Sequence, residues 1–364
     1  MYNYLLMTGG INIRQVNLMT KVSIIGATGY AGQELVRLLC GHPKVEIKGL
    51  GTQNYKGQPF SDVYPNFRGI VDLPCQGADD PQLIAESDVI FLAMPHGQSV
   101  SLAQTAVEQG KKVIGLGADF RLRDPKVYEE WYQTKAAPAE QLAKAVYGLP
   151  EVNRQVISQC SLLANPGCYP TTVILALGPL LKEKAIDPAW LIIDSKSGVS
   201  GAGRGTTLTT HYCEVNEDFK AYGVPRHRHT PEIEQELSKL AGQEVQVSFT
   251  PHLIPATRGM LSTIYTVPLA GINAGKIAEI YQAYYGKEPF IRLLPVGEVP
   301  HTKWVSGTNY CDLAYSLDPR TGRLTIFSAI DNLVKGAAGQ AVQNMNIMLG
   351  LEETLGLPRV AIYP

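Results

Sequence analysis

Apolar residues in the first half of the chain fall into two alternating patterns, short continuous runs and longer stretches with helical spacing. The continuous runs predict buried strands at 21–25, 45–50, 89–93, 112–116 and 161–164. The helical spacing predicts helices that begin near Ala31 and cover 99–109 and 171–181. Strands that alternate with helices in this way are typical of a parallel sheet with right-handed crossovers, so we expect an α/β fold.

The second half of the chain is dominated by predicted strands. They lie at 191–194, 245–249, 261–267, 310–317 and 324–330. A turn signal at 318–322 joins the last two, and one helix is predicted at 277–285. This pattern indicates a second, α+β domain with a mostly antiparallel sheet, after which the chain ends in a helix near 335–349.

Composition and charge exclude several classes of protein. Among the 364 residues 45% are hydrophobic and 18% charged, which supplies a core for two or three domains and argues against disorder. The net charge of −1 gives no basic field for nucleic acid or an anionic membrane surface. No apolar run reaches about 18 residues, and the first residues lack a basic leader. We therefore expect a cytoplasmic protein without nucleic-acid or membrane partners.

The cysteines indicate one reactive thiol. The six cysteines include no CxxC pair and no alternation with histidine, so we expect free thiols in a reducing compartment and no metal site. Cys168 differs from the others because it follows a buried strand and the turn 165–167 and begins a helix. The positive end of the helix dipole is expected to lower the pKa of its thiol. We predict that Cys168 is a nucleophile, with a structural thiol as the alternative.

A glycine-rich loop at 26–32 joins the first predicted strand to the first predicted helix. Gly26 allows a tight turn, Gly29 lets the backbone approach a pyrophosphate, and Gly32 lets the helix pack closely on the sheet. The N–H groups at the start of the helix then bind phosphate. The spacing is GxxGxxG rather than GxGxxG, so a glycine turn of another α/β protein is the alternative, but the strand–loop–helix context favours a dinucleotide.

The end of the second predicted strand favours NADP(H) over NAD(H). An NAD-binding domain usually has an acidic residue there that binds the ribose 2′-hydroxyl, whereas this chain has Thr52 and Lys56 and no acid. Glu46 lies at the start of the strand, far from the ribose. Thr52 and Lys56 could contact a 2′-phosphate, although both could also be merely solvated.

Two further segments carry polar groups suited to an anionic substrate. Arg226-His227-Arg228-His229 combines cations with proton-transferring side chains, and its alternative is a solvated basic loop. His252 is a second candidate for proton transfer. The loop 197–205 follows a strand, and its backbone and Arg204 could bind phosphate or carboxylate, with a flexible linker as the alternative.

Six motifs in register, from about Lys21 to the C-terminus, resemble the N-acetyl-gamma-glutamyl-phosphate reductases of the semialdehyde dehydrogenase superfamily. They are Gly26-Ala27-Thr28-Gly29-Tyr30-Ala31-Gly32, Leu92-Ala93-Met94-Pro95-His96-Gly97, Asn165-Pro166-Gly167-Cys168-Tyr169-Pro170-Thr171, the loop Ser197–Arg204, His227-Arg228-His229-Thr230-Pro231-Glu232-Ile233 and the segment Asp331–Gln340.

The resemblance implies a reaction and a set of site residues. N-acetyl-L-glutamyl 5-phosphate would be reduced by NADPH to N-acetyl-L-glutamate 5-semialdehyde, with release of phosphate and through a thioester, in arginine biosynthesis. Cys168 would be the nucleophile and His227 the acid–base. The cofactor would be bound by Gly26, Thr28, Gly29, Tyr30, Ala31, Gly32, Thr52, Pro95, Gly97, Ser200, Gly201 and Asn332. The substrate would be bound by Arg121, Asn165, Ser197, Arg204 and His229.

The implied fold is a Rossmann-type NADP-binding domain plus an α+β catalytic and dimerisation domain, assembled as homodimers or homotetramers. We expect an extension at 1–19, the NADP-binding domain at 20–167, the catalytic domain at 168–330, and at 331–364 a helix that returns to the first domain. Aspartate-semialdehyde dehydrogenase and N-acetyl-aminoadipyl-phosphate reductase share the chemistry and are alternatives. A cysteine hydrolase or a non-catalytic NADP sensor would leave the glycine loop or Cys168 without a role.

Overall fold

The computed structural model describes residues 19–363, and the predicted extension at 1–19, apart from Met19, lies outside them. The first of two sheets has the strand order β3-β2-β1-β4-β5-β7-β6, and every pairing in it is parallel. Its strands are β1 (Thr20–Ile25), β2 (Val45–Thr52), β3 (Gln76–Gly77), β4 (Val89–Leu92), β5 (Lys112–Gly115), β6 (Val146–Tyr147) and β7 (Leu162–Ala164). The predicted α/β fold with a Rossmann-type sheet is thus confirmed.

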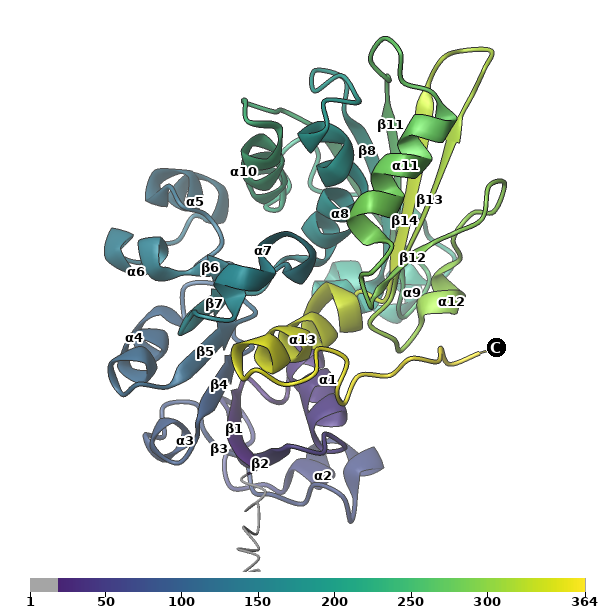
Figure 1. Ribbon diagram of the computed structural model, residues 1–364. Coiled ribbons are helices and arrows are strands. Elements are labelled where there is room, and N and C mark those ends of the chain that lie inside the picture. The colour runs from purple at the N-terminus through teal and green to yellow at the C-terminus, as the bar shows by residue number, and fades with distance from the viewer. Residues whose placement is uncertain (1–18, 364) are drawn as a thin grey trace, which may run out of the picture.

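Helices cover this sheet on both sides in Figure 1. They are α1 (Tyr30–Leu39), α2 (Phe60–Val63), α3 (Gln82–Ala85), α4 (Val100–Glu108), α5 (Pro125–Tyr132), α6 (Ala139–Lys144) and α7 (Pro150–Ile157), with a 3₁₀ turn at Pro65–Phe67. The central strand β4 is fully buried, as its uninterrupted apolar sequence predicts. Among these helices the sequence predicted only α1 and α4.

The second sheet has the order β12-β13-β14-β11-β8-β10-β9. Its strands are β8 (Ile192–Gly198), β9 (Lys220–Ala221), β10 (Ser248–Ile254), β11 (Met260–Thr266), β12 (Ile291–Leu293), β13 (Cys311–Leu317) and β14 (Leu324–Ile330). Four of its six pairings are antiparallel, while β8/β10 and β12/β13 are parallel. The sheet is therefore mixed, with the predicted majority of antiparallel pairs.

Helix α8 (Cys168–Lys182) is the core of this second part. Every residue from Tyr169 to Leu181 is buried, because the helix packs on the sheet and is flanked by α10 (Thr230–Ala241) and α11 (Ala274–Tyr285) (Figure 1). A helix that is apolar all round is stable only in such a position. The buried helix therefore fixes its first residue, Cys168, rigidly in the molecule.

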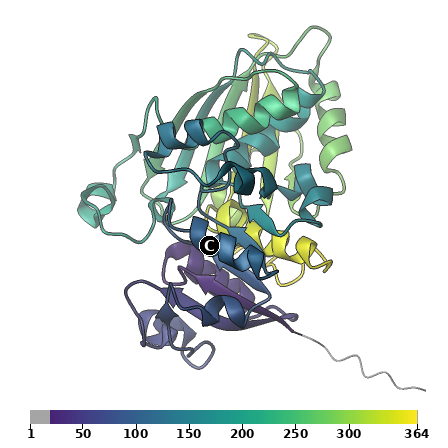
Figure 2. The ribbon, with the colours of Figure 1, turned by 90° about the vertical axis from the view of Figure 1, so that its left-hand side faces the viewer.

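The last helix joins the two parts of the molecule. A π-helical turn at Val334–Ala338 leads directly into α13 (Gly339–Met348), where the sequence predicted a single helix. This segment packs against α1, α7 and α8 and lies at the junction of the two parts in Figure 2. Smaller elements complete the chain, namely 3₁₀ turns at Val199–Ala202 and Leu208–Thr210 and the helices α9 (Tyr212–Val215) and α12 (Thr302–Val305). No helix among residues 19–363 is long and apolar enough to span a membrane.

Candidate active site

A cavity of about 860 Å³ lies where the two parts of the molecule meet. The glycine loop, the loop after β4, the start of α8 and the π-helical turn all contribute to its wall, together with the residues after β8 and the His227–His229 segment. The predicted site residues that line it are Thr28, Gly29, Tyr30, Ala31, Pro95, Arg121, Asn165, Cys168, Ser197, Ser200, Gly201, Arg204, His227, His229 and Asn332. Gly26, Gly32, Thr52 and Gly97 do not line it.

The turn before Cys168 is held by hydrogen bonds from distant parts of the chain. Gly167 donates its backbone N–H to Glu232 Oε1 at 2.8 Å. The carbonyl oxygen of Asn165 accepts from Arg121 Nε at 2.8 Å, and its side-chain amide donates to the Ala337 carbonyl at 3.0 Å. Asn165 therefore fixes the turn before Cys168, and its side-chain amide is hydrogen-bonded within the protein.

The thiol of Cys168 does not behave as the helix position alone predicts. Burial raises its pKa to about 11, and this outweighs the lowering by the Tyr169 backbone N–H and by Arg121. The expectation of a lowered pKa is therefore wrong for the ligand-free protein. The neutral thiol is therefore the main form of Cys168 at pH 7.

The raised pKa predicts how Cys168 reacts with iodoacetamide. Only the thiolate is alkylated, and its fraction rises with pH until the pH passes the pKa. The alkylation rate of Cys168 in the ligand-free protein is expected to keep rising from pH 7 to about pH 10, without a plateau. The rate is measured by mass spectrometry on the Cys168 peptide, because Cys40 and Cys213 are also exposed to the reagent. A plateau near neutral pH would show that the helix dipole outweighs burial.

Glu232 is a site residue to which sequence reasoning gave no role. Its side chain is fully buried, and its Oε2 lies 3.1 Å from Arg121 Nη1. Tyr147 donates its hydroxyl to Oε1 at 2.8 Å, alongside the Gly167 N–H. Burial lowers the pKa of Arg121, but Glu232 outweighs this effect and holds the pKa above its usual value. The signal in the sequence was a carboxylate among the buried residues of α10, beside Ile233 and Leu237.

Two of the three candidate histidines lie at the cavity. His227 and His229 line it with their ring centroids 5.0 Å apart, and both rings contact Tyr169 edge-on. An added Cβ on Gly167 would lie 2.8 Å from His229 Nε2, so this ring packs against the nucleophile turn. His252 does not line the cavity, and its Nδ1 lies 3.2 Å from Asp194 Oδ1 on the second sheet.

The hydrogen bonds of His227 favour one form of its ring. The backbone N–H of His229 donates to His227 Nδ1 at 3.1 Å, so a neutral ring carries its proton on Nε2. Burial and then Arg228 lower the pKa of His227 to about 4. Burial and then His227 lower the pKa of His229 well below its usual value. Both rings are neutral at pH 7, and His227 is a hydrogen-bond donor through Nε2.

The glycine loop has the geometry that a dinucleotide requires. Gly26 has a φ of +92°, and an added Cβ would lie 2.2 Å from the carbonyl oxygen of Ala93. A Cβ on Gly32 would lie 2.2 Å from the carbonyl oxygen of Gly26, so both glycines shape the loop from behind the cavity wall. Gly29 and Tyr30 then present the N-terminus of α1 to the cavity. These residues fit the pyrophosphate of a nicotinamide dinucleotide.

Thr52 and Gly97 are predicted cofactor residues that do not line the cavity. The hydroxyl of Thr52 is buried and lies 2.9 Å from that of Thr28, which does line the cavity. Gly97 donates its backbone N–H to the buried carboxylate of Asp119 at 2.7 Å. Thr52 thus lies one layer behind the cavity surface, whereas Gly97 is exposed and lies outside the cavity wall.

Arg204 lies beside the cofactor loop, although we expected it at the substrate. Its Nη1 donates to the Thr28 carbonyl at 2.9 Å. Its guanidinium lies over the rings of Tyr55 and Tyr64, at 5.4 and 4.7 Å from their centroids. This side chain from the second part of the molecule therefore crosses to the glycine loop.

Asn332 and Ser200 form the wall on the side of the second part. Asn332 donates its amide to the Ser200 hydroxyl at 2.9 Å and accepts the Gly259 N–H at 2.8 Å. An added Cβ on Gly336 would lie 2.8 Å from the Cβ of Cys168, so the π-helical turn packs directly against Cys168. π-Helical turns are frequent at functional sites, where they let backbone approach in this way.

Family models match both parts of the chain. The semialdehyde dehydrogenase NAD binding domain matches residues 21–160, and the semialdehyde dehydrogenase dimerisation domain matches residues 168–332. An N-acetyl-gamma-glutamyl-phosphate reductase from Pelotomaculum thermopropionicum is 56% identical over 95% of this chain and 100% of its own length. A reductase of the same name from Desulforudis audaxviator is 54% identical with the same coverage. The chain belongs to the N-acetyl-gamma-glutamyl-phosphate reductase family.

Solved structures agree with this family on the fold. Aspartate semialdehyde dehydrogenase II from Vibrio cholerae, complexed with ASA, superposes with a TM-score of 0.70 over 91% of this chain and 98% of its own, at 18% identity. The Candida albicans aspartate semialdehyde dehydrogenase with NADP gives 0.67 over 91% and 98%, at 16% identity. At these identities the likeness shows the fold alone, and the closer reductase relatives decide the family.

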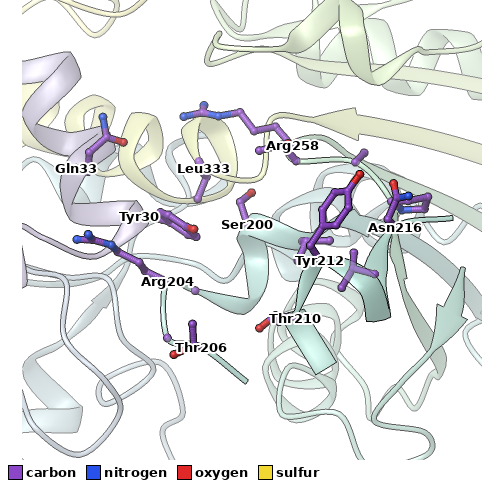
Figure 3. A pocket seen from close by; sticks show the side chains of 17 residues that line it. Tyr30, Gln33, Ser200, Arg204, Thr206, Thr210, Tyr212, Asn216, Arg258 and Leu333 are labelled. Carbon is purple, nitrogen blue, oxygen red and sulfur yellow. The ribbon is translucent and has the colours of Figure 1, made fainter. Parts of the chain in front are cut away.

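A second cavity of about 610 Å³ adjoins the active site of this family member (Figure 3). Tyr30, Ser200, Arg204 and Leu333 belong to the walls of both cavities. Gln33 of α1 and Arg258, from the turn between β10 and β11, also line the second cavity. Both cavities lie beside the N-terminal part of α1, whose buried apolar residues pack in a core shared with β14 and the π-helical turn.

Proposed function

We propose that this chain reduces N-acetyl-L-glutamyl 5-phosphate to N-acetyl-L-glutamate 5-semialdehyde with NADPH and releases phosphate, as a step of arginine biosynthesis. One observation carries the proposal. Cys168, His227 and the N-terminus of α1 open into a single cavity, in a chain that aligns over 95% of its length with reductases of that name. That cavity joins a nucleophile, a hydrogen-bond donor and a dinucleotide site.

Cys168 provides the covalent step. Its sulfur attacks the acyl phosphate carbonyl, a C–S bond forms and the C–O bond to phosphate breaks. The thiol proton leaves with the phosphate group, so a thiol and an acyl phosphate dianion give a thioester and hydrogen phosphate. The Tyr169 backbone N–H, which already favours the thiolate, stabilises the charge on sulfur during the attack.

His227 acts as a neutral donor in this proposal. Its Nε2–H donates to the carbonyl oxygen as that oxygen gains negative charge, while Nδ1 stays bound to the His229 backbone. A histidine with a pKa near 4 remains neutral throughout the physiological range, which suits a donor better than a general base. Bound NADPH would supply hydride to the thioester carbonyl. The C–S bond then breaks with its electron pair on sulfur, the aldehyde is released, and the Cys168 thiolate takes a proton from solvent to restore the thiol.

The cofactor is NADP(H) rather than NAD(H) in this proposal. Gly26 and Ala27 donate their backbone N–H groups to the Gly51 carbonyl, so the end of β2 lies against the glycine loop. Glu46, at the other end of β2, pairs with Lys48 and is remote from the ribose. Lys56 is exposed just after β2, where a 2′-phosphate would lie.

Turnover with matched substrates tests the function and the cofactor together. Phosphate-dependent reduction of NADP is expected with N-acetylglutamate semialdehyde. The kcat/KM for aspartate semialdehyde or N-acetyl-aminoadipate semialdehyde should be at least about tenfold lower. The kcat/KM with NADP is expected to be about 10- to 100-fold higher than with NAD, because one or two charge-assisted contacts to the 2′-phosphate contribute that much. Equal rates with aspartate semialdehyde would favour the dehydrogenase alternative.

We further propose that two copies of the chain pair through the face of the second sheet that its helices leave uncovered. Ile192 and Tyr265 face each other in register on β8 and β11, and each is 41% exposed. Leu261 and Phe327 are partly exposed on the same face. Light scattering is expected to give twice the 39.6 kDa chain mass. Tyr265→Asp should lower this mass to that of one chain, and an unchanged mass would place the interface elsewhere.

A further inference from the structure

Arg258 lies between two buried carboxylates that belong to distant parts of the chain. Its Nη2 is 2.6 Å from Glu34 Oε2 on α1, and its Nη1 is 3.2 Å from Asp331 Oδ2, directly after β14. Both carboxylates are fully buried. Figure 3 shows the Arg258 side chain extending from its strand end toward the helices that carry Gln33 and Leu333.

The Glu34 end of this bridge belongs to the cofactor helix. Glu34 lies about one turn after Tyr30, which lines the cavity at the N-terminus of α1. Arg37 also pairs with Glu34, at 2.7 Å. Burial would raise the pKa of Glu34, but the hydrogen bonds from Arg258 and Arg37 outweigh burial and lower it. Glu34 is therefore ionised, and its charge ties α1 to the second part of the molecule.

The Asp331 end belongs to the wall that faces the cofactor helix. Asp331 accepts backbone N–H groups from Gly307 at 2.7 Å, Leu333 at 2.8 Å and Val334 at 3.2 Å. The neighbouring Asn332 accepts from Gly259, the residue after Arg258, and donates to Ser200. The Arg258–Gly259 turn thus holds both Asp331 and Asn332.

We propose that Arg258 is a positioning residue, which sets the distance between α1 and the Asn332–Ser200 wall and thereby holds the nicotinamide in place against the thioester of Cys168. This role rests on the proposed function. Arg258 lines the second cavity and not the first, so it acts through α1 and Asn332. The apolar face of α1 packs in a core shared with the π-helical turn, and the Arg258–Glu34 ion pair adds a charged contact beside the second cavity that refines the position of α1.

The bridge can be removed without leaving a charged Glu34 unpaired, while Asp331 loses its ion pair with Arg258. Arg258→Met alone would weaken the pairing of Glu34 and is expected to destabilise the protein. In the double variant Glu34→Gln/Arg258→Met, neutral side chains of similar size replace both partners, and Asp331 keeps its three backbone N–H groups. Such replacements are often neutral for stability, so the folded double variant tests positioning separately from folding.

The double variant is expected to melt near the wild-type temperature. Its KM for NADPH should rise about tenfold or more and kcat should fall, whereas KM for the acyl phosphate and the alkylation rate of Cys168 should change less than about twofold. Arg37→Met is the matched control, because Arg37 pairs with Glu34 but not with Asp331, and it should leave both KM values unchanged.

Two outcomes would overturn the proposal. One is wild-type KM for NADPH and wild-type kcat in a stably folded double variant. The other is a parallel rise of both KM values with a loss of melting temperature, which indicates a general structural role. If the wild-type chain does not reduce the acyl phosphate at all, the proposed function fails. The Kd of NADPH, measured by fluorescence titration of both proteins, then still decides whether the bridge positions the cofactor.

Discussion

Cys168→Ser is expected to lower kcat for NADPH-dependent reduction of N-acetylglutamyl phosphate by about 10⁴-fold or more. The serine hydroxyl is a much weaker nucleophile than a thiolate, and an oxygen ester accepts hydride less readily than a thioester. The glycine loop and α1 are separate from the Cys168 turn, so the Kd of NADPH should stay within about twofold of wild type. Single-turnover kinetics and fluorescence titration measure the two quantities.

Cys213→Ser provides the control for this experiment. Cys213 is exposed and lies outside the cavity, so its replacement should leave turnover unchanged. The two variants together separate loss of the nucleophile from a general sensitivity to thiol replacement. Turnover near the wild-type rate in Cys168→Ser would show that no thioester forms on this residue.

The periodic parts of the sequence predicted the central strands of both sheets. The buried runs of β1, β4 and β5 carry enough apolar residues to identify them without tertiary information. β8 and β10 were harder to delimit. The predicted strand at 191–194 continues to Gly198 in the structure. Ser195 is polar but buried there, because its hydroxyl hydrogen-bonds that of Ser262 at 2.7 Å, so the apolar pattern did not show the full strand. Pro251 lies inside β10, where a proline argues against a strand.

The site was predictable where chemistry is local in sequence. The position of Cys168 after a strand and before a helix, and the glycine loop, were both visible in the chain itself. The raised pKa of Cys168 was not, because it depends on burial by segments that come together only in the fold. The contact of Arg204 with Tyr55 and Tyr64 could not be predicted for the same reason, since both tyrosines lie some 140 to 150 residues earlier in the chain.

Glu232→Leu is expected to have the second largest effect. The change leaves the buried charge of Arg121 without its partner and removes the acceptor of the Gly167 N–H and the Tyr147 hydroxyl. Breaking a buried pair from one side costs about 3–5 kcal/mol, so the melting temperature should fall by roughly 10 °C. Thermal denaturation measures this loss.

Glu232→Gln separates stability from positioning. Glutamine keeps a carbonyl oxygen for the Gly167 N–H but loses the charge that pairs with Arg121, so the nucleophile turn is held less firmly. The folded variant should have a kcat about tenfold lower, with an unchanged Kd for NADPH. Glu236→Gln is the matched control, because Glu236 is a buried carboxylate one turn along the same helix that contacts Gln235 and Arg123 instead of Gly167 and Arg121. Its kcat should stay at the wild-type value. Equal kcat in both glutamine variants would mean that the charge of Glu232 does not position Cys168.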